Sequence, residues 1–140
     1  MNLPELLVDL TTHYNALIRS AASQLHLTFS QAFHLISIPH DGIPLSKLAY
    51  KLGLDASTLT RNIQKLEKLT LVTRISDDYD SRISKVILTK GGAALVKLLD
   101  SSLEDYNYNI LEQIDLETQE HLITVLEKLS WALISTRENL

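Results

Sequence analysis

Cysteine is absent from this 140-residue sequence, and glycine and proline are scarce, with four and three residues. The lack of cysteine excludes disulfides, thiolate zinc sites, iron–sulfur clusters and thiol-based redox sensing. So few glycines and prolines leave little room for the many tight turns of an all-β sandwich. The length fits one globular domain, and we expect it to be mainly helical.

Long hydrophobic runs are also missing. The longest apolar runs span four residues, as at 131–134, far below the roughly 20 residues that cross a bilayer. The first five residues have neither the basic nor the apolar region of a signal peptide. We therefore expect a cytoplasmic protein without a membrane partner. The sequence also has no Gly-rich phosphate loop, GxSxG or HExxH motif, so we predict no enzymatic activity and no cofactor.

Charge is distributed unevenly along the chain. The net charge is -4, but it is -2 over residues 1–43, +4 over residues 44–90 and -6 over residues 91–140. The middle segment holds nine of the 13 basic residues. This distribution is typical of a phosphate-binding surface flanked by acidic segments. Chance clustering on a solvated surface is the alternative explanation.

Apolar residues at three- and four-residue spacing predict four helices in the first half of the chain. Thr28 and Gln31 form a capping box at the start of the second helix. Gly53 can adopt the left-handed conformation that ends the third. We expect the first helix at residues 3–24, a second that begins after Thr28 and is ended by Pro39 and Gly42, a third at 45–52 and a fourth at 56–69.

The segment at 56–69 has one apolar and one polar face. Leu59, Ile63 and Leu66 share one side of the predicted helix. The other side carries hydroxyl, amide and cationic groups, from Ser57, Thr60, Arg61, Gln64, Lys65 and Lys68. Two short helices joined by residues 53–55, the second with small hydroxyls before long donors, are typical of a helix-turn-helix. An amphipathic helix in a bundle would show the same two faces.

After residue 70 the sequence period changes from 3.6 to 2. Residues 72–76 and 85–89 read as two strands joined by the polar loop at 77–84. A hairpin directly after a helix-turn-helix predicts a wing, whose basic tip can lie against the minor groove of DNA.

Five short motifs follow one another along the chain. They are Leu27-Thr28-x-x-Gln31, Leu48-Ala49-x-x-Leu52-Gly53-Leu54, Ser57-Thr58-Leu59-Thr60-Arg61 followed by Leu66-Glu67-Lys68, Asp80-x-Arg82, and Leu88-Thr89-x-x-Gly92. In this order they resemble the multiple antibiotic resistance regulator (MarR) family of winged-helix transcription factors, over nearly the whole chain.

The resemblance implies a mainly α fold with a small two- to three-stranded β wing. It divides a single domain, residues 1–140, into a winged helix-turn-helix DNA-binding lobe at 28–92 and a helical dimerisation region at 1–26 and 93–140. It further implies a homodimer that binds a pseudo-palindromic double-stranded DNA operator. Such proteins usually repress genes and release DNA when a small-molecule effector binds.

The resemblance also assigns roles to single residues. Arg82 is expected to enter the minor groove, and Asp80 is the acidic partner that holds the wing. A plain Asp-rich turn is the alternative for Asp80. The predicted major-groove contacts are Ser57, Thr58, Thr60 and Arg61, followed by Gln64 and Lys65.

Two positions depart from the family pattern. Thr70 stands where the family usually has glycine after the recognition helix. A β-branched residue disfavours the left-handed conformation of such a cap, so this position predicts a rebuilt turn into the wing. Pro44 replaces the usual hydroxyl cap of the third helix, where proline suits a first helical turn.

The acidic last third predicts two more helices, one starting near Thr89 and one capped by Asp115. Their apolar stripes are wide for one small monomer, which favours burial in a partner subunit.

Of the five histidines, no pair has zinc-ligand spacing, and we predict no metal site. His13 and His34 fall in elements that border the ligand pocket of the family, and we take them as pocket candidates.

An alternative function belongs to another class. A winged-helix dimer that has lost DNA binding could serve as a protein-interaction module. The net charge of -4 and the Thr70 departure favour this alternative.

Overall fold

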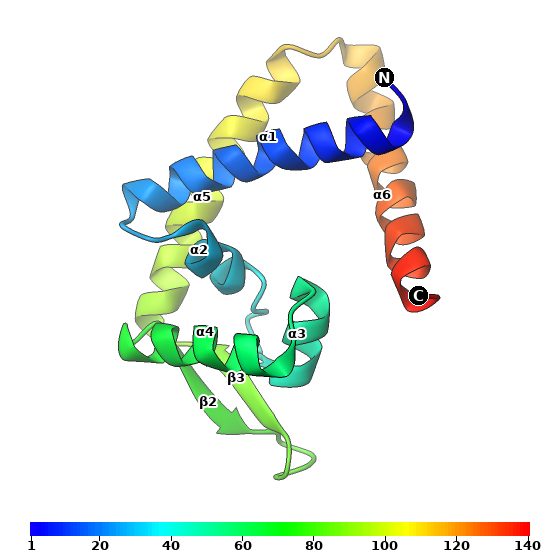
Figure 1. The fold of residues 1–140 in the computed structure, drawn as a ribbon. Helices are drawn as coiled ribbons and strands as arrows, with labels where there is room; N and C mark the ends of the chain where they lie inside the picture. Colours follow the sequence, from blue (N-terminus) through cyan, green and yellow to red (C-terminus); the bar gives the residue numbers. More distant parts are fainter. The chain divides into compact units, whose positions relative to one another are not determined.

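The computed structural model describes all 140 residues, Met1–Leu140. It contains six helices and one three-stranded antiparallel sheet (Figure 1), which confirms the mainly helical fold with a small β wing. None of the helices has the length and apolar character of a membrane span. The elements in chain order are α1 (Leu3–Gln24), α2 (Phe29–Ile36), β1 (Ile43–Pro44), α3 (Leu45–Leu52), α4 (Ala56–Lys68), β2 (Val72–Ser76), β3 (Ser84–Leu88), α5 (Lys90–Glu112) and α6 (Leu116–Glu138).

The chain divides into two compact units, Met1–Leu103 and Glu104–Leu140. The first unit holds α1 to α4, the sheet and the first part of α5, and the second holds the end of α5 and α6. The finer division into a DNA-binding lobe and a dimerisation region stays a prediction.

Side chains just before the helices fix where several of them begin. Thr28 accepts a hydrogen bond from the Gln31 N–H at 3.1 Å, and Gln31 accepts one from the Thr28 N–H at 3.0 Å. This confirms the predicted capping box. Asn2 and Glu5 form a second capping box at the start of α1, which the sequence analysis did not identify.

The core of the first unit is built where α2, α3, α4 and the sheet meet. Its largest fully buried side chains include Leu35 of α2, Leu48 of α3, Ile63 of α4 and Val86 of β3. The predicted apolar face of α4 is confirmed, since Leu59, Ile63 and Leu66 are all buried. The core therefore fixes which side of α4 remains in solvent.

Three helices end in a residue with left-handed backbone, and only one of these is glycine. Gly53 has φ 70°, as predicted, whereas His26 has φ 58° and Thr70 has φ 59°. The prediction of a rebuilt turn at Thr70 is wrong. Its N–H donates to the Glu67 carbonyl at 2.9 Å and the Leu71 N–H donates to the Leu66 carbonyl at 3.0 Å, the two bonds of a Schellman motif. These bonds hold the β-branched residue in the conformation that glycine would adopt freely.

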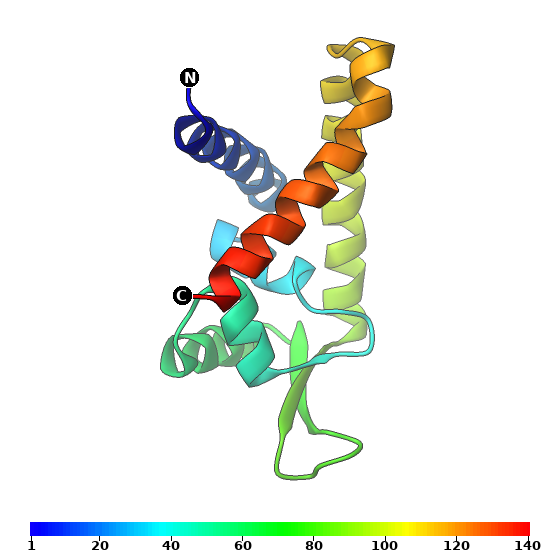
Figure 2. The same cartoon turned by 90° about the vertical axis from the view of Figure 1, so that its right-hand side faces the viewer.

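The sheet has the strand order β1-β3-β2. β2 pairs with β3 from Val72 opposite Leu88 to Ser76 opposite Ser84, one residue earlier on β3 than predicted. The short strand β1 completes the sheet. Val72 and Val86 are buried, while β2 beyond Val72 is exposed, so the hairpin is anchored at its base and extends away from α3 and α4 (Figure 2).

Candidate nucleic-acid interface

The solvent-facing side of α4 collects all six predicted major-groove residues. Ser57, Arg61, Gln64 and Lys65 are exposed, and Thr58 and Thr60 are half-buried. Because the opposite face is held in the core by three buried aliphatic side chains, this face cannot rotate away from solvent. It presents small groups in the first turn and long hydrogen-bond donors behind them, as a helix that enters a major groove requires.

Asp55 organises the start of α4. Its Oδ1 accepts hydrogen bonds from the Thr58 N–H at 2.8 Å and from the Ser57 hydroxyl at 2.7 Å, and its Oδ2 accepts one from the Thr58 hydroxyl at 2.9 Å. The Thr58 N–H first, and then the two hydroxyls, lower the pKa of Asp55 to about 2. Asp55 is thus the N-cap of α4 as well as the last residue of the turn before it, and this cap was not predicted.

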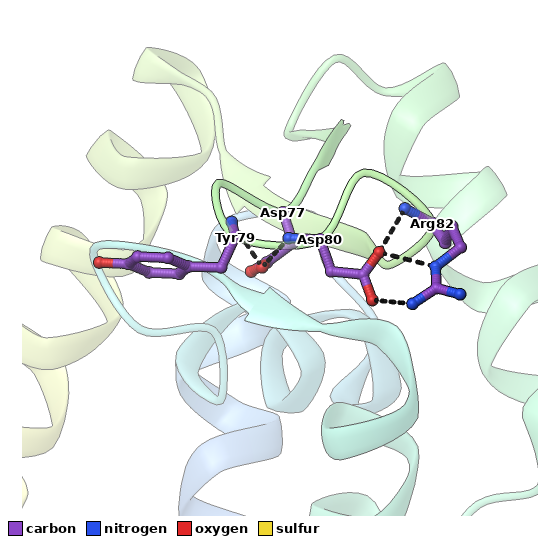
Figure 3. A network of polar contacts seen from close by, with 4 residues as sticks. All are labelled: Asp77, Tyr79, Asp80 and Arg82. Atoms are coloured by element: carbon purple, nitrogen blue, oxygen red, sulfur yellow. Dashed lines mark hydrogen bonds and ion pairs between the residues drawn. The ribbon is translucent and has the colours of Figure 1, made fainter.

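The wing tip holds the second predicted contact (Figure 3). Arg82 Nε and Nη2 each donate to one carboxylate oxygen of Asp80 at 3.0 Å, and the Arg82 N–H donates to Asp80 Oδ1 at 3.0 Å. The arginine side chain is nonetheless 88% exposed. The hydrogen bonds from the Arg82 side chain lower the pKa of Asp80, and those to Asp80 raise the pKa of Arg82. The carboxylate therefore fixes the guanidinium without covering it.

Asp77 shapes the loop that carries this pair. Its Oδ2 accepts from the backbone N–H groups of Tyr79 at 3.0 Å and Asp80 at 3.1 Å. Figure 3 shows the Tyr79 ring pointing away from the Asp80–Arg82 pair. The loop thus combines an Asp-rich turn with a carboxylate that holds the arginine, and the role of Asp80 in supporting the wing stays a prediction.

The base of the wing is tied to neighbouring helices. Arg74 Nη2 lies 3.0 Å from Glu67 Oε1, which joins β2 to α4. The Thr89 hydroxyl donates to the Thr70 carbonyl at 2.6 Å and accepts from the Gly92 N–H at 3.1 Å. A Cβ at Gly92 would overlap the Leu71 carbonyl oxygen. The Leu88-Thr89-x-x-Gly92 motif therefore packs the start of α5 closely against the turn that leads into β2.

His34 connects α2 to α4. It is 4% exposed, and its Nδ1 lies 2.6 Å from the Ser30 carbonyl oxygen, to which it must donate. Its Nε2 then accepts from Asn62 Nδ2 at 3.2 Å. Burial lowers the pKa of His34, and the bond to Ser30 opposes part of that shift. His34 borders one cavity of about 140 Å³ shared with Lys65 and another of about 250 Å³ shared with Phe33.

His13 lies in a different setting. It is exposed, and its Nε2 is 3.3 Å from Asp9 one turn earlier on α1. The structure does not group three or more His, Asp or Glu side chains in a way that could hold a metal ion. The pocket role of both histidines stays a prediction.

Residues 27–84, which span the second helix to the wing, match the model of the MarR family. This segment of the chain is similar to the MarR family. The matched segment includes α4, the Asp80–Arg82 pair and every predicted DNA contact. The predicted family resemblance is confirmed.

Similar proteins extend this result. The organic hydroperoxide resistance transcriptional regulator of Bacillus subtilis (strain 168) is 30% identical over 88 residues, which are 62% of this chain and 57% of that protein. The chain thus matches less than two thirds of this relative's length. A crystal structure of MarR superposes with a TM-score of 0.83 at 20% identity, covering 100% of this chain and 96% of that one. A MarR mutant from E. coli in complex with operator DNA has a TM-score of 0.73 at 26% identity, covering 91% and 92%.

Proposed function

We propose that this chain is a transcriptional regulator of the MarR family that binds double-stranded DNA sequence-specifically. The observation that carries the proposal is the exposed donor face of α4, with Arg61, Gln64 and Lys65, on the same unit as the immobilised and exposed Arg82. Arg and Gln are suited to base edges in the major groove, and an arginine on a wing is suited to the minor groove. The operator complex of the E. coli MarR mutant supports the proposal by similarity.

We propose that the protein acts as a homodimer. Large apolar side chains on α1 and α6 are exposed, and α6 has no buried residue. A monomer rarely leaves so much apolar surface in water. Two copies related by a two-fold axis would present two α4 helices to the half-sites of a pseudo-palindrome. The exposed residues on α6 include Ile123, Val125, Leu126, Trp131, Leu133 and Ile134.

We also propose that it is a cytoplasmic repressor that a small ligand releases from DNA, as the family resemblance implies. His34 supports coupling of this kind. It borders two cavities and bonds to Asn62 of α4. A molecule that displaced His34 would therefore change a contact of α4.

The test is a selection of bound duplexes from a random library, followed by fluorescence anisotropy at several salt concentrations. We expect an enriched inverted repeat and a steep loss of affinity with salt, about 0.9 in logarithmic slope per neutralised phosphate. Arg82→Ala should weaken binding, and Arg61→Ala should cost about 1–3 kcal/mol at one preferred base. Lys128→Ala, which removes one exposed charge from α6, is the matched control.

The interaction-module alternative predicts the opposite result. It retains one sequence feature in its favour, the net charge of -4, whereas the turn at Thr70 keeps the backbone that glycine would have. No enrichment, with weak binding that salt does not affect, would contradict DNA recognition and support this alternative. If Arg61→Ala and Arg82→Ala bind like the parent, the assigned contacts are wrong.

A further inference from the structure

The hydroxyl groups in the first turns of α4 have their protons engaged within the protein. Ser57 donates to Asp55 Oδ1 at 2.7 Å, and Thr60 donates to the Ala56 carbonyl at 2.9 Å. Thr58 donates to Asp55 Oδ2 at 2.9 Å and accepts from Arg61 Nη2 at 3.4 Å. A hydroxyl has one proton and two acceptor lone pairs. Ser57 and Thr60 can therefore offer an external partner only an acceptor.

The partners of these protons are hard to displace. Asp55 is ionised at physiological pH, and the cap lowers its pKa further, to about 2. Hydrogen bonds to a carboxylate are about twice as strong as those between neutral groups. The Thr60 bond to the carbonyl one turn earlier lies within the helix itself. Turning either hydroxyl toward an external acceptor would break these bonds.

The two side chains also lie where bases would be read. Ser57 and Thr60 are three residues apart on α4, and Arg61 and Gln64 continue the same stripe. Ser57 is exposed and Thr60 half-buried. Ser57 and Thr60, which can only accept hydrogen bonds, thus lie on the same stripe as the long donor side chains of Arg61 and Gln64.

Acceptor-only groups discriminate between the parts of DNA. Phosphate oxygens are acceptors, so Ser57 and Thr60 cannot bind them in this arrangement. In the major groove the donors are the exocyclic amino groups, N6 of adenine and N4 of cytosine. We propose that Ser57 and Thr60 are specificity residues that accept hydrogen bonds from adenine or cytosine amino groups in each half-site. This inference rests on the proposed function and adds the class of base that the first two turns of α4 read.

The experiment uses the full chain and the duplex enriched in the selection. Adenines or cytosines in the half-site are replaced one at a time by purine or 2-pyrimidinone, which lack the amino group. At one or two positions we expect the parent to lose about three- to tenfold in affinity, the size of one hydrogen bond between neutral groups. The same replacement in the flanking duplex controls for weaker base pairing.

A double-mutant cycle then assigns the contact. Ser57→Ala or Thr60→Val should lose affinity for the natural base and show no further loss with the analogue. If the analogue weakens the parent and both variants equally, or if both variants weaken all duplexes alike, the hydroxyls do not read amino groups and the proposal is overturned.

Removing the carboxylate that accepts the Ser57 proton provides a second measurement. Asp55→Gly removes the carboxylate but keeps a residue that N-caps well. The freed Ser57 hydroxyl should then tolerate guanine or thymine at the base that it reads, and the preference for the amino-bearing base there should fall about three- to tenfold. Thr60 still donates to the Ala56 carbonyl and should keep its preference. Asp115→Gly removes the matching cap of α6 and should leave base preference unchanged. An unchanged preference at the base assigned to Ser57 would contradict the proposal for that residue.

The two proposals fail in different ways. An absence of any enriched duplex would overturn the proposed function and this inference with it. An enriched duplex whose affinity is insensitive to amino-group removal under α4 would leave DNA binding intact and overturn only the assignment of Ser57 and Thr60.

Discussion

The helices α4 and α6 begin in the same way and are buried differently. Asp55 accepts from the N–H and the hydroxyl of Thr58, and Asp115 accepts from the N–H and the hydroxyl of Thr118 at nearly the same distances. Yet α4 buries Leu59, Ile63 and Leu66, whereas α6 buries no residue. A local cap therefore determines where a helix starts and has no influence on whether its apolar face is covered.

This difference indicates two sources of stability. The apolar face of α4 packs inside its own unit, so α4 should be stable at any protein concentration. The apolar side chains of α6 are exposed in the single chain, so their burial requires a partner and should depend on concentration.

The largest effect is expected from one substitution made on both helices. Ile63→Ala removes a fully buried side chain and should lower the free energy of unfolding by about 2–5 kcal/mol. Ile123→Ala, at a side chain that is 62% exposed, should change it by about 0.5 kcal/mol or less in dilute solution. Urea unfolding at low protein concentration measures both values. Equal losses would contradict the difference between the two helices.

The next largest effect is expected on the association of two copies of the chain. Leu126→Glu places a charge in the exposed apolar surface of α6 and should raise the dissociation constant of the proposed homodimer about 100-fold, because that charge would be desolvated on association. Lys128→Glu changes an exposed charged position on the same helix and serves as the control. Sedimentation equilibrium gives both constants. A dimer unaffected by Leu126→Glu would place the interface elsewhere.

A smaller effect is expected at the turn after α4. Thr70→Gly should relieve the strain of a β-branched residue at φ 59° and stabilise the protein by about 1 kcal/mol, since the greater freedom of glycine in the unfolded chain offsets part of the gain. Thermal unfolding measures the change. Gly53→Thr, the reverse change at φ 70°, should be destabilising. A loss of stability in Thr70→Gly would show that the threonine is not strained.

The smallest effect is expected on the free energy of unfolding when the pH is lowered. Burial holds the pKa of His34 below its usual 6.5, so the unfolded chain binds a proton at a pH where the folded chain does not. Stability from His34 is therefore fully present above pH 6.5 and falls as the pH drops toward the lowered pKa. Urea unfolding between pH 8 and 5 should show this decline, and His34→Gln should reduce it. An identical decline in the variant would assign it to other groups.

Much of the candidate interface was predictable from short-range patterns. The spacing of Leu59, Ile63 and Leu66 predicted which side of α4 is buried, and hence which polar residues face solvent. The two-residue spacing of Asp80 and Arg82 is short enough for their side chains to meet within one loop. The role of Asp55 as the acceptor of two hydroxyl protons was not predicted, although the Asp-x-Ser-Thr pattern is a signal for an N-cap.

The sequence alone determined where the helices begin to within a residue, the Thr28 and Asp115 caps and the wing hairpin, because these depend on hydrogen bonds and apolar periodicity within a few residues. Only the tertiary structure decided that Thr70 keeps a left-handed turn, that β1 joins the sheet and that His34 is buried against Asn62. Each of these involves a group far away in the chain. Thr89 bonds to the Thr70 carbonyl in addition to the local Schellman bonds, β3 pairs with β1, and Asn62 of α4 bonds to His34. Local preferences at these positions were weaker than the contacts that the fold supplied.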